Sequence, residues 1–263
     1  MEIDLRGRVA IVTGGGRGIG REIAATLAAE GVKTVVTDVD RDNLTELGEL
    51  FEENDWEGRQ LICDVRDAKR IAEVVDEVTD TYGRIDILVN NAGVLTPGWV
   101  ESLSEEAWDL SADVNLKGVF LMCKAVIPIM KRQGSGRIIN AASFAAIIPS
   151  AGSASYAATK AGVHYFTRVL AGELGPWGIT VNCYAPGMIP TEMNHFADAA
   201  PEQQDRLLNT LTLRKWGDPK DVATLICFLA SDLAGYITGT MVDVSGGKFA
   251  TQFPQAAYEK AIP

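Results

Sequence analysis

Short apolar runs rich in β-branched residues alternate with longer amphipathic stretches along almost the whole chain. The runs predict strands, and the first of them, Val9 to Thr13, stops at a row of glycines. The stretch that follows repeats apolar residues at Ile19, Ile23 and Leu27, which is helical spacing, and it ends at Gly31, a residue typical of helix C-termini. The other predicted strands are Thr34 to Thr37, Leu61 to Cys63, Ile85 to Asn90, Arg137 to Asn140, Ile179 to Cys183 and Met241 to Val244.

Further helices are predicted around residues 68–80, 105–132, 155–174 and 219–230. Seven apolar strands separated by helices predict a doubly wound α/β fold, with a mostly parallel sheet covered by helices on both faces. No stretch has the composition of a linker or repeat, so residues 1–263 are expected to form one domain. Loops that follow strand ends line the ligand crevice of such sheets. Most of the less regular segments are therefore expected to wall a substrate site: 94–103, 144–153, 188–216 with a lid at about 188–213, and the tail 248–263.

Composition narrows the classes of partner. The 263 residues are 47% hydrophobic, which is enough for a large core. Thirty-five acidic residues against 24 basic ones give a net charge of -11, which argues against nucleic acid or an anionic membrane surface as a partner. The best candidate for a membrane span, Val119 to Met130, is interrupted by Lys124 and Pro128, and the polar start of the chain is not expected to be a secretory signal. We therefore expect a cytoplasmic protein.

Metal-binding residues are sparse and scattered. The chain has four cysteines and two histidines, and none of them forms a metal-ligand motif: Cys63, Cys123, Cys183, Cys227, His164 and His195. Neither a metal site nor a disulfide framework is expected, and the cysteines are interpreted as buried reduced thiols. No catalytic role is assigned to His164, which is expected to pack at a helix or subunit surface.

A glycine-rich turn joins the first predicted strand to the first helix, with the sequence Thr13-Gly-Gly-Gly-Arg-Gly-Ile-Gly20. Gly14 permits a tight turn, Gly18 lets the backbone approach a pyrophosphate, and Gly20 allows close packing of the helix. The N–H groups at the helix start then face the phosphates. Any tight strand-to-helix turn can use glycines, but the position after the first strand of an alternating pattern favours dinucleotide binding.

Two charged residues point to different cofactors. Asp38 ends the second strand, where a carboxylate accepts hydrogen bonds from the adenosine ribose and repels a 2′-phosphate, favouring NAD over NADP. Arg17, within the glycine loop, is able to pair with a 2′-phosphate. We give more weight to Asp38, because an unpaired carboxylate beside a phosphate dianion is directly unfavourable. The further candidate cofactor contacts at the ends of the third and fourth strands are Asp64, Val65, Asn91, Ala92 and Gly93.

Three residues with proton-handling chemistry follow in order: Ser143, Tyr156 and Lys160. Tyr156 and Lys160 are four residues apart, so they share a helical face. An ammonium near a phenol favours the phenolate, and a nearby hydroxyl completes a site that moves a proton to or from an alcohol oxygen. Each residue also has an ordinary structural interpretation as a turn residue, a core aromatic or a surface cation.

Several motifs follow one another along the chain: Thr-Gly-x-x-x-Gly-Ile-Gly at 13–20, Asn-Asn-Ala-Gly at 90–93, Asn115, Ser143, Tyr-Ala-Ala-Thr-Lys at 156–160 and Pro-Gly at 186–187. In this order they resemble the compact single-domain type of the short-chain dehydrogenase/reductase family, from Leu5 to about Gly247. The resemblance implies a Rossmann-type fold, a nicotinamide cofactor and hydride transfer at a CH–OH group.

The resemblance also implies roles. Tyr156 is the acid/base that exchanges a proton with the substrate oxygen. Lys160 bonds the nicotinamide ribose and lowers the pKa of that tyrosine, and Ser143 hydrogen-bonds the substrate oxygen. Asn115 resembles the asparagine that holds a water linking Lys160 to solvent. The segment that contacts the nicotinamide comprises Pro186, Gly187, Ile189 and Thr191.

The substrate is less well determined. The expected walls mix apolar and polar residues without an arginine cluster, so we expect NAD-dependent oxidation of a secondary alcohol of the polyol or sugar type. The first alternative is an NADPH-dependent ketoreductase of the 3-ketoacyl type, although the acidic composition disfavours an acidic acyl carrier. The second is a non-catalytic nucleotide-binding protein. The candidate substrate contacts are Ser143, Phe144, Ser153, Met188 and His195.

The resemblance further implies a homotetramer or a homodimer. In that assembly the helix carrying Tyr156, Lys160 and His164 packs against a partner subunit. The apolar tail from Phe249 to Pro263 extends beyond the last strand, and it is expected to contribute to an interface.

Overall fold

The computed structural model describes residues 3–194 and 196–261, which contain one seven-stranded sheet. All strand pairs are parallel, in the order β3-β2-β1-β4-β5-β6-β7, so the predicted fold class is confirmed. The order reverses between β1 and β4, and an open α/β sheet binds its ligand at such a switch point. The strands are β1 (Val9–Thr13), β2 (Lys33–Asp38), β3 (Gly58–Ile62), β4 (Ile87–Asn90), β5 (Gly136–Ala141), β6 (Ile179–Pro186) and β7 (Met241–Val244).

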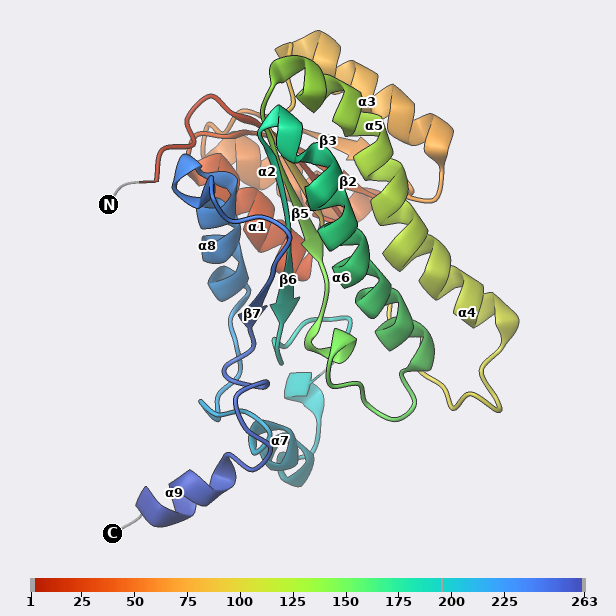
Figure 1. Ribbon diagram of the computed structural model, residues 1–263, viewed down its shortest axis with the longest axis vertical. Helices are drawn as coiled ribbons and strands as arrows, with labels where there is room; N and C mark the ends of the chain where they lie inside the picture. The colour runs from red at the N-terminus through yellow and green to blue at the C-terminus, as the bar shows by residue number, and fades with distance from the viewer. Residues whose placement is uncertain (1–2, 195, 262–263) are drawn as a thin grey trace.

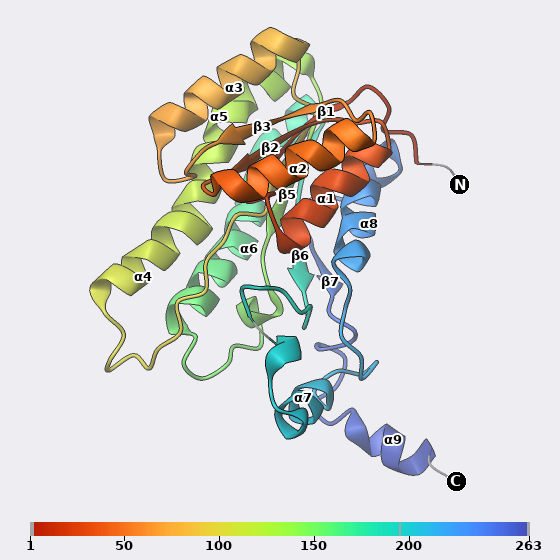
Figure 2. The same ribbon diagram turned by 180° about the vertical axis from the view of Figure 1, so that it is seen from behind.

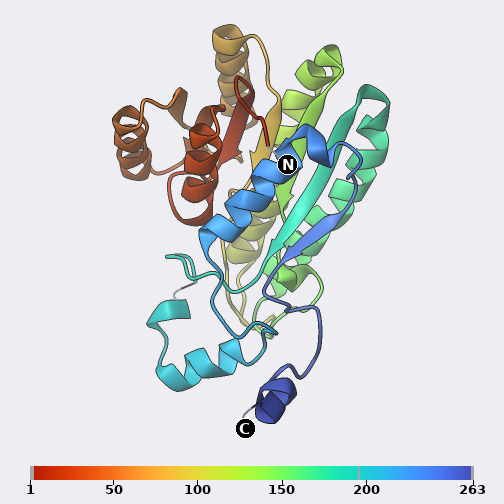
Figure 3. The same cartoon turned by 90° about the vertical axis from the view of Figure 1, so that its left-hand side faces the viewer.

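Helices cover both faces of the sheet, as the side view in Figure 3 shows. Central strands such as β1 and β5 are buried along their whole length for this reason, which explains their continuous apolar runs. One face, seen in Figure 2, carries α1 (Gly18–Ala29), α2 (Arg41–Glu53) and α8 (Pro219–Ala230). The other, seen in Figure 1, carries α3 (Ala68–Tyr82), α5 (Gly118–Gln133) and α6 (Ala154–Leu174). Short 3₁₀ turns lie at η2 (Phe144–Ala146), η3 (Gly175–Trp177) and η5 (Asp232–Ala234).

Helix α2 is absent from the sequence-based expectation, although its signals are present. The Asp40 side chain caps it by accepting from the Asp42 and Asn43 N–H groups at 3.0 and 3.2 Å. Leu44, Leu47 and Phe51 then repeat at helical spacing and are buried against α1 and β2. Because most other positions of α2 are polar, its mean hydropathy hides this narrow apolar stripe.

The single helix predicted at 105–132 is divided by a π-helical turn. Helix α4 (Glu105–Ala112) passes into η1 (Asp113–Lys117) and then into α5 without leaving helical backbone angles. A π turn widens the helix by one residue, and such turns are common at functional sites. Here the turn contains the fully buried Asn115.

The segment at 188–216 is more regular than expected. It contains η4 (Phe196–Asp198) and α7 (Pro201–Leu208), which starts at Pro201, a residue suited to the first turn of a helix. The tail forms α9 (Gln255–Ala261), which projects from the body below α7 (Figure 1). The Tyr258 hydroxyl donates to the Thr212 carbonyl at 2.8 Å and so joins the tail to the end of the lid. No helix within residues 3–194 and 196–261 is long and apolar enough to cross a membrane.

Candidate active site

A cavity of about 600 Å³ opens at the carboxyl ends of the strands. The glycine loop forms one wall, the ends of the central strands form the floor, and a covering segment made of residues 186–194 with Phe196 closes the opposite side. A volume of this size suits a cofactor with a small substrate. The position agrees with the switch point between β1 and β4.

The glycine loop is tight enough to exclude side chains at two positions. Gly14 has φ of +61°, and a Cβ there would lie 2.6 Å from the Ala92 Cα. A Cβ at Gly20 would overlap the Gly14 carbonyl oxygen and the Asn91 carboxamide. Gly20 therefore allows the helix start to pack on the loop itself, in addition to the helix packing that the sequence suggested.

Asn91 bonds the loop to the end of β4. Its Nδ2 donates to the Thr13 and Gly14 carbonyl oxygens at 3.2 and 2.9 Å, and its Oδ1 accepts from the Tyr184 hydroxyl at 3.0 Å. The Asn91 carboxamide therefore stabilises the glycine loop. Asn91, Ala92 and Gly93 all line the cavity, as predicted for cofactor contacts. The Asn91 backbone N–H also has a partner, the Thr13 Oγ1 at 3.1 Å, so a contact of Asn91 with a cofactor stays a prediction.

The Asp38 carboxylate is held in place at the end of β2. It accepts backbone N–H groups from Gly16 at 3.0 Å, Val39 at 2.8 Å and Asp40 at 3.1 Å. Arg17 lies nearby on the loop, and its guanidinium pairs with Glu192 of the lid at 3.0 Å. Asp38 and Arg17 both line the cavity, so the two residues that pointed to different cofactors meet there.

Asp64 and Val65 line the same end of the cavity. The Asp64 carboxylate forms a fork-shaped pair with Arg66, with distances from 2.6 to 3.0 Å. The hydrogen bond from Arg66 lowers the pKa of Asp64. Val65 is buried and packs closely on Gly118, where α5 begins.

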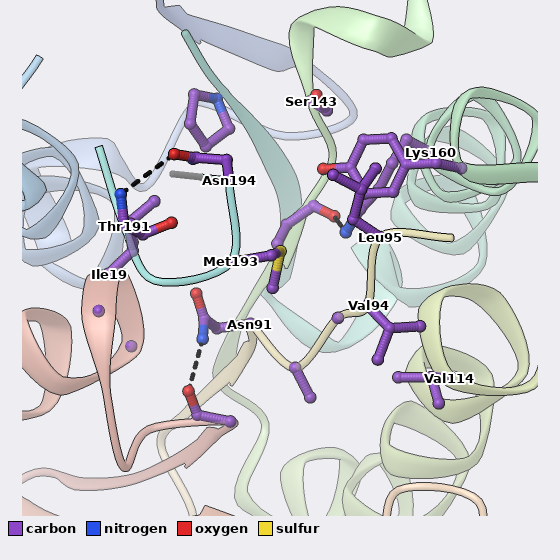
Figure 4. Close-up of a pocket in the computed structure, with 18 of the residues that line it drawn as sticks. Ile19, Asn91, Val94, Leu95, Val114, Ser143, Lys160, Thr191, Met193 and Asn194 are labelled. Carbon is purple, nitrogen blue, oxygen red and sulfur yellow. Dashed lines mark hydrogen bonds between the residues drawn. The ribbon is translucent and has the colours of Figure 1, made fainter. Parts of the chain in front are cut away.

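The structure brings Ser143, Tyr156 and Lys160 together. Ser143 lies just after β5, the other two lie one turn apart on α6, and all three line the cavity. Figure 4 shows Ser143 and Lys160. Ser143 and Lys160 are only 5% and 3% exposed. The Lys160 Nζ donates to the Ala141 carbonyl at 2.7 Å and lies 5.7 Å from the centre of the Tyr156 ring.

Burial has the largest effect on the pKa values of Tyr156 and Lys160. It raises the pKa of Tyr156 above its usual range, while a hydrogen bond with Ser143 acts in the opposite direction. Burial also lowers the pKa of Lys160 to about 8. Lys160 is not among the causes that shift the pKa of Tyr156, and its ammonium donates to the Ala141 carbonyl instead.

Asn115 connects the π turn to the loop after β4. Its Oδ1 accepts from the Val94 N–H at 2.8 Å and its Nδ2 donates to the Val94 carbonyl at 2.9 Å. A Cβ at Gly93 would lie 3.2 Å from the Asn115 Oδ1 and 3.6 Å from the Lys160 Nζ, so the two residues flank this glycine. The geometry shows Asn115 positioning the loop beside Lys160.

The predicted substrate contacts divide into three groups. Ser143, Phe144 and Ser153 line the cavity. Met188 is buried and does not belong to its lining. The neighbouring Ile189 lines the cavity, and a substrate contact by Met188 stays a prediction. His195 lies outside the described residues.

Polar side chains of the substrate loops already have partners within the protein. The Asn194 Oδ1 accepts from the Thr191 and Phe196 N–H groups at 3.2 Å each, and its Nδ2 donates to the Ile189 carbonyl at 2.8 Å (Figure 4). The Ser153 hydroxyl donates to the Ser150 carbonyl at 2.6 Å. The remaining substrate walls are mainly apolar and include Leu95, Pro97, Phe144, Met193 and Phe196.

Comparison with known proteins identifies the family. A family profile described as Enoyl-(Acyl carrier protein) reductase matches residues 14–248, a span that contains the glycine loop and the Ser143, Tyr156 and Lys160 group. The chain belongs to the short-chain dehydrogenase/reductase family. The sequence-based resemblance is thereby confirmed. As a member of this family, the protein is an oxidoreductase that acts on CH–OH groups with NAD(P).

Relatives in this family differ in their substrates. The chain is 38% identical over 244 residues to the 3-oxoacyl-(acyl-carrier-protein) reductase FabG of Thermotoga maritima, which covers 92% of this chain and 98% of that protein. It is 40% identical over 245 residues to BbsD of Thauera aromatica, a hydroxy(phenyl)methylsuccinyl-CoA dehydrogenase subunit, over 93% and 97% of the two chains. A solved gluconate 5-dehydrogenase from Burkholderia cenocepacia, in complex with NADP and tartrate, matches at a TM-score of 0.90 with 31% identity, over 95% and 98% of the two chains.

Several cavity residues of this short-chain dehydrogenase/reductase escaped the sequence analysis, among them Leu110, Val114 and Tyr184. Leu110 and Val114 are four residues apart, so helical spacing places both on one face, but nothing in the sequence shows that this face meets the cavity. Tyr184 precedes Pro186 by two residues in β6, which puts both side chains on the same side of the strand. That alternation was the available signal for Tyr184.

Proposed function

We propose that this protein interconverts a 3-oxoacyl compound and the corresponding 3-hydroxyacyl compound, with a small apolar acyl group in the cavity. The observation that carries this proposal is that polar side chains around the cavity already bond to other residues of the protein. Asn194 and Ser153 bond to the protein itself, and Glu192 pairs with Arg17. Binding a polyol without partners for its hydroxyl groups is costly, whereas an acyl chain needs only apolar walls.

The relatives support the same choice. The Thermotoga maritima FabG is named for a 3-oxoacyl substrate, and the Thauera aromatica BbsD for a hydroxyacyl-CoA compound. The ketoreductase alternative is therefore preferred to the polyol oxidation that the sequence first suggested. The gluconate 5-dehydrogenase is a counterexample among the matches, but its identity to this chain is lower at 31%.

The chain's own residues supply the proton and the positioning. Because burial raises the pKa of Tyr156, its phenol is protonated at neutral pH and suited to donate a proton to a carbonyl oxygen that becomes an alcohol. Ser143 donates a hydrogen bond to the same oxygen as negative charge develops on it. Lys160 provides a positive charge beside the site, and Asn115 holds the loop that borders it. The bound nicotinamide supplies or accepts the hydride.

The residues at the glycine loop fit a dinucleotide. Gly18, Ile19 and Gly20 line the cavity at the start of α1, where the first N–H groups have no partner within the helix. Further contacts are expected at Asp64, Val65, Pro186, Gly187 and Thr191, all of which line the cavity. We propose NAD(H) as the preferred form, because Asp38 is held by three backbone N–H groups at the position where a ribose diol would bind.

A substrate panel tests the proposed reaction. Reduction of acetoacetyl-CoA and of a short 3-oxoacyl cysteamine thioester is compared with oxidation of gluconate and sorbitol, using the absorbance of the reduced nicotinamide. We expect kcat/KM for the thioesters to exceed that for the polyols by at least about a hundredfold. Turnover of a polyol without turnover of either thioester would contradict the proposal and restore the polyol dehydrogenase.

Substitution of Asp38 tests the cofactor preference. Asp38→Asn removes the negative charge but keeps the size of the side chain, so the ratio of kcat/KM with NADP(H) to that with NAD(H) should rise by at least about tenfold. Asp42→Asn is the matched control, because Asp42 is exposed and does not line the cavity. An unchanged ratio in the Asp38 variant would remove this residue from the proposed role.

A homotetramer or a homodimer remains our proposal for the assembly. Large apolar side chains are exposed on the face formed by α4, α5 and α6, which supports an interface there: Trp108 at 45%, Phe120 at 44% and Tyr165 at 64%. His164 is half-buried on the same helix as Tyr165. The exposed Phe253 of the tail supports a second contact region.

A further inference from the structure

The ion pair between Arg17 and Glu192 joins two walls of the cavity that are distant in sequence. Arg17 is the residue at the start of α1, and Glu192 belongs to the covering segment, with their Nη1 and Oε2 atoms 3.0 Å apart. The two walls also touch beside this pair, because a Cβ at Gly18 would lie 3.6 Å from the Thr191 methyl group. Figure 4 shows Thr191 next to Ile19, at the start of the same helix.

This end of the cavity carries more negative than positive charge. Its lining includes two guanidinium groups and three carboxylates: Arg17, Arg66, Asp38, Asp64 and Glu192. Each guanidinium is paired with one carboxylate, Arg66 with Asp64 and Arg17 with Glu192. The third carboxylate, Asp38, bonds the N–H of Gly16, the residue directly before Arg17. Among the described residues that line this end, a 2′-phosphate would therefore meet no guanidinium without a carboxylate partner.

We propose that Glu192 is a cofactor-specificity residue, which acts by occupying the guanidinium that a 2′-phosphate would need. The chain then discriminates against NADP with two carboxylates, Asp38 by direct repulsion and Glu192 through Arg17. This inference rests on the proposed preference for NAD(H). Discrimination between NAD and NADP would then depend on a residue of the covering segment as well as on residues at the ends of β1 and β2.

The size of the effect follows from the exposure of the pair. The Arg17 and Glu192 side chains are 56% and 67% exposed, so solvent screens their interaction and a phosphate dianion competes for the guanidinium. We therefore expect Glu192 to weaken NADP binding by about three- to fivefold, less than the contribution of Asp38. The effect should shrink at high ionic strength, because both partners are in contact with water.

Dissociation constants of NAD⁺ and NADP⁺ for the purified protein test the inference without any substrate. They are measured by calorimetric titration for the wild type, Glu192→Gln, Arg17→Gln and the double variant, each also in the Asp38→Asn background, where NADP⁺ binds more tightly. Glu202→Gln is the control of equal charge, since Glu202 is exposed on α7 and lies outside the cavity lining.

Glu192→Gln should lower the NADP⁺ constant about three- to fivefold, leave the NAD⁺ constant unchanged, and lose its effect when Arg17 is replaced. An unchanged NADP⁺ constant would overturn the inference, and so would an equal effect in the Arg17→Gln background. A parallel change for both nucleotides would also overturn it and would show that the pair only holds the covering segment. Tighter binding of NADP⁺ than of NAD⁺ by the wild type would refute the proposed NAD(H) preference. That outcome is distinct from failure of the inference about Glu192, which is tested by the change in the NADP⁺ constant on substitution.

Discussion

Tyr156→Phe is expected to lower turnover on the order of a thousandfold while leaving cofactor binding intact. The substitution removes only the hydroxyl that is proposed to donate the proton, and a positioned acid or base contributes about 10²- to 10⁴-fold to such a step. The glycine loop and Asp38, which are proposed to bind the cofactor, lie on other elements and are not changed. Initial rates with a 3-oxoacyl thioester and a titration with NADH measure the two effects.

Tyr165→Phe is the matched control for this experiment. Tyr165 lies on the same helix, is 64% exposed and loses the same hydroxyl, so its kinetics should match the wild type. If Tyr156→Phe retained more than about a tenth of the activity, Tyr156 would not be the proton donor, because loss of a positioned acid costs more than this. Equal losses in both tyrosine variants would instead indicate a change in the helix.

Lys160→Met is expected to abolish most of the turnover and to change how stability depends on pH. Lys160 has a pKa of about 8 in the folded protein and a higher pKa in the unfolded chain. Between pH 8 and about 10.5 the unfolded chain therefore binds more protons, and the free energy of unfolding of the wild type rises with pH in this window. Below pH 8 the buried ammonium costs about 3 kcal/mol, given about 1.4 kcal/mol for each pKa unit.

Thermal or denaturant unfolding of the two proteins at several pH values measures this effect. The stability of the wild type relative to Lys160→Met should be constant below pH 8, rise between pH 8 and 10.5, and then level off. Lys220→Met, which replaces an exposed lysine on α8, should show no such window. A flat difference for Lys160→Met across this range would mean that the buried lysine is not destabilised in the fold.

Much of the architecture follows from local patterns. The central strands of the sheet were predicted because their runs are buried on both faces, and the glycine loop because Gly14 and Gly20 occupy positions that exclude a Cβ. Helix α2 was missed, since a narrow apolar stripe of Leu44, Leu47 and Phe51 is diluted by polar neighbours. Ile189 lines the cavity and Met188 does not, a difference that the sequence could not show because no period determines side-chain direction in an irregular segment.

By itself, the sequence determined the fold class, the family and the identities of Ser143, Tyr156 and Lys160, because period, spacing and chemical type are local properties. Only the tertiary structure decided which partners those residues meet. Folding directs Lys160 at the Ala141 carbonyl, removes the Tyr156 phenol from water and pairs Arg17 with Glu192, a residue 175 positions away. Burial and long-range pairing depend on how distant segments pack, and these effects set the pKa values of the proton-handling group and the charge around the cofactor.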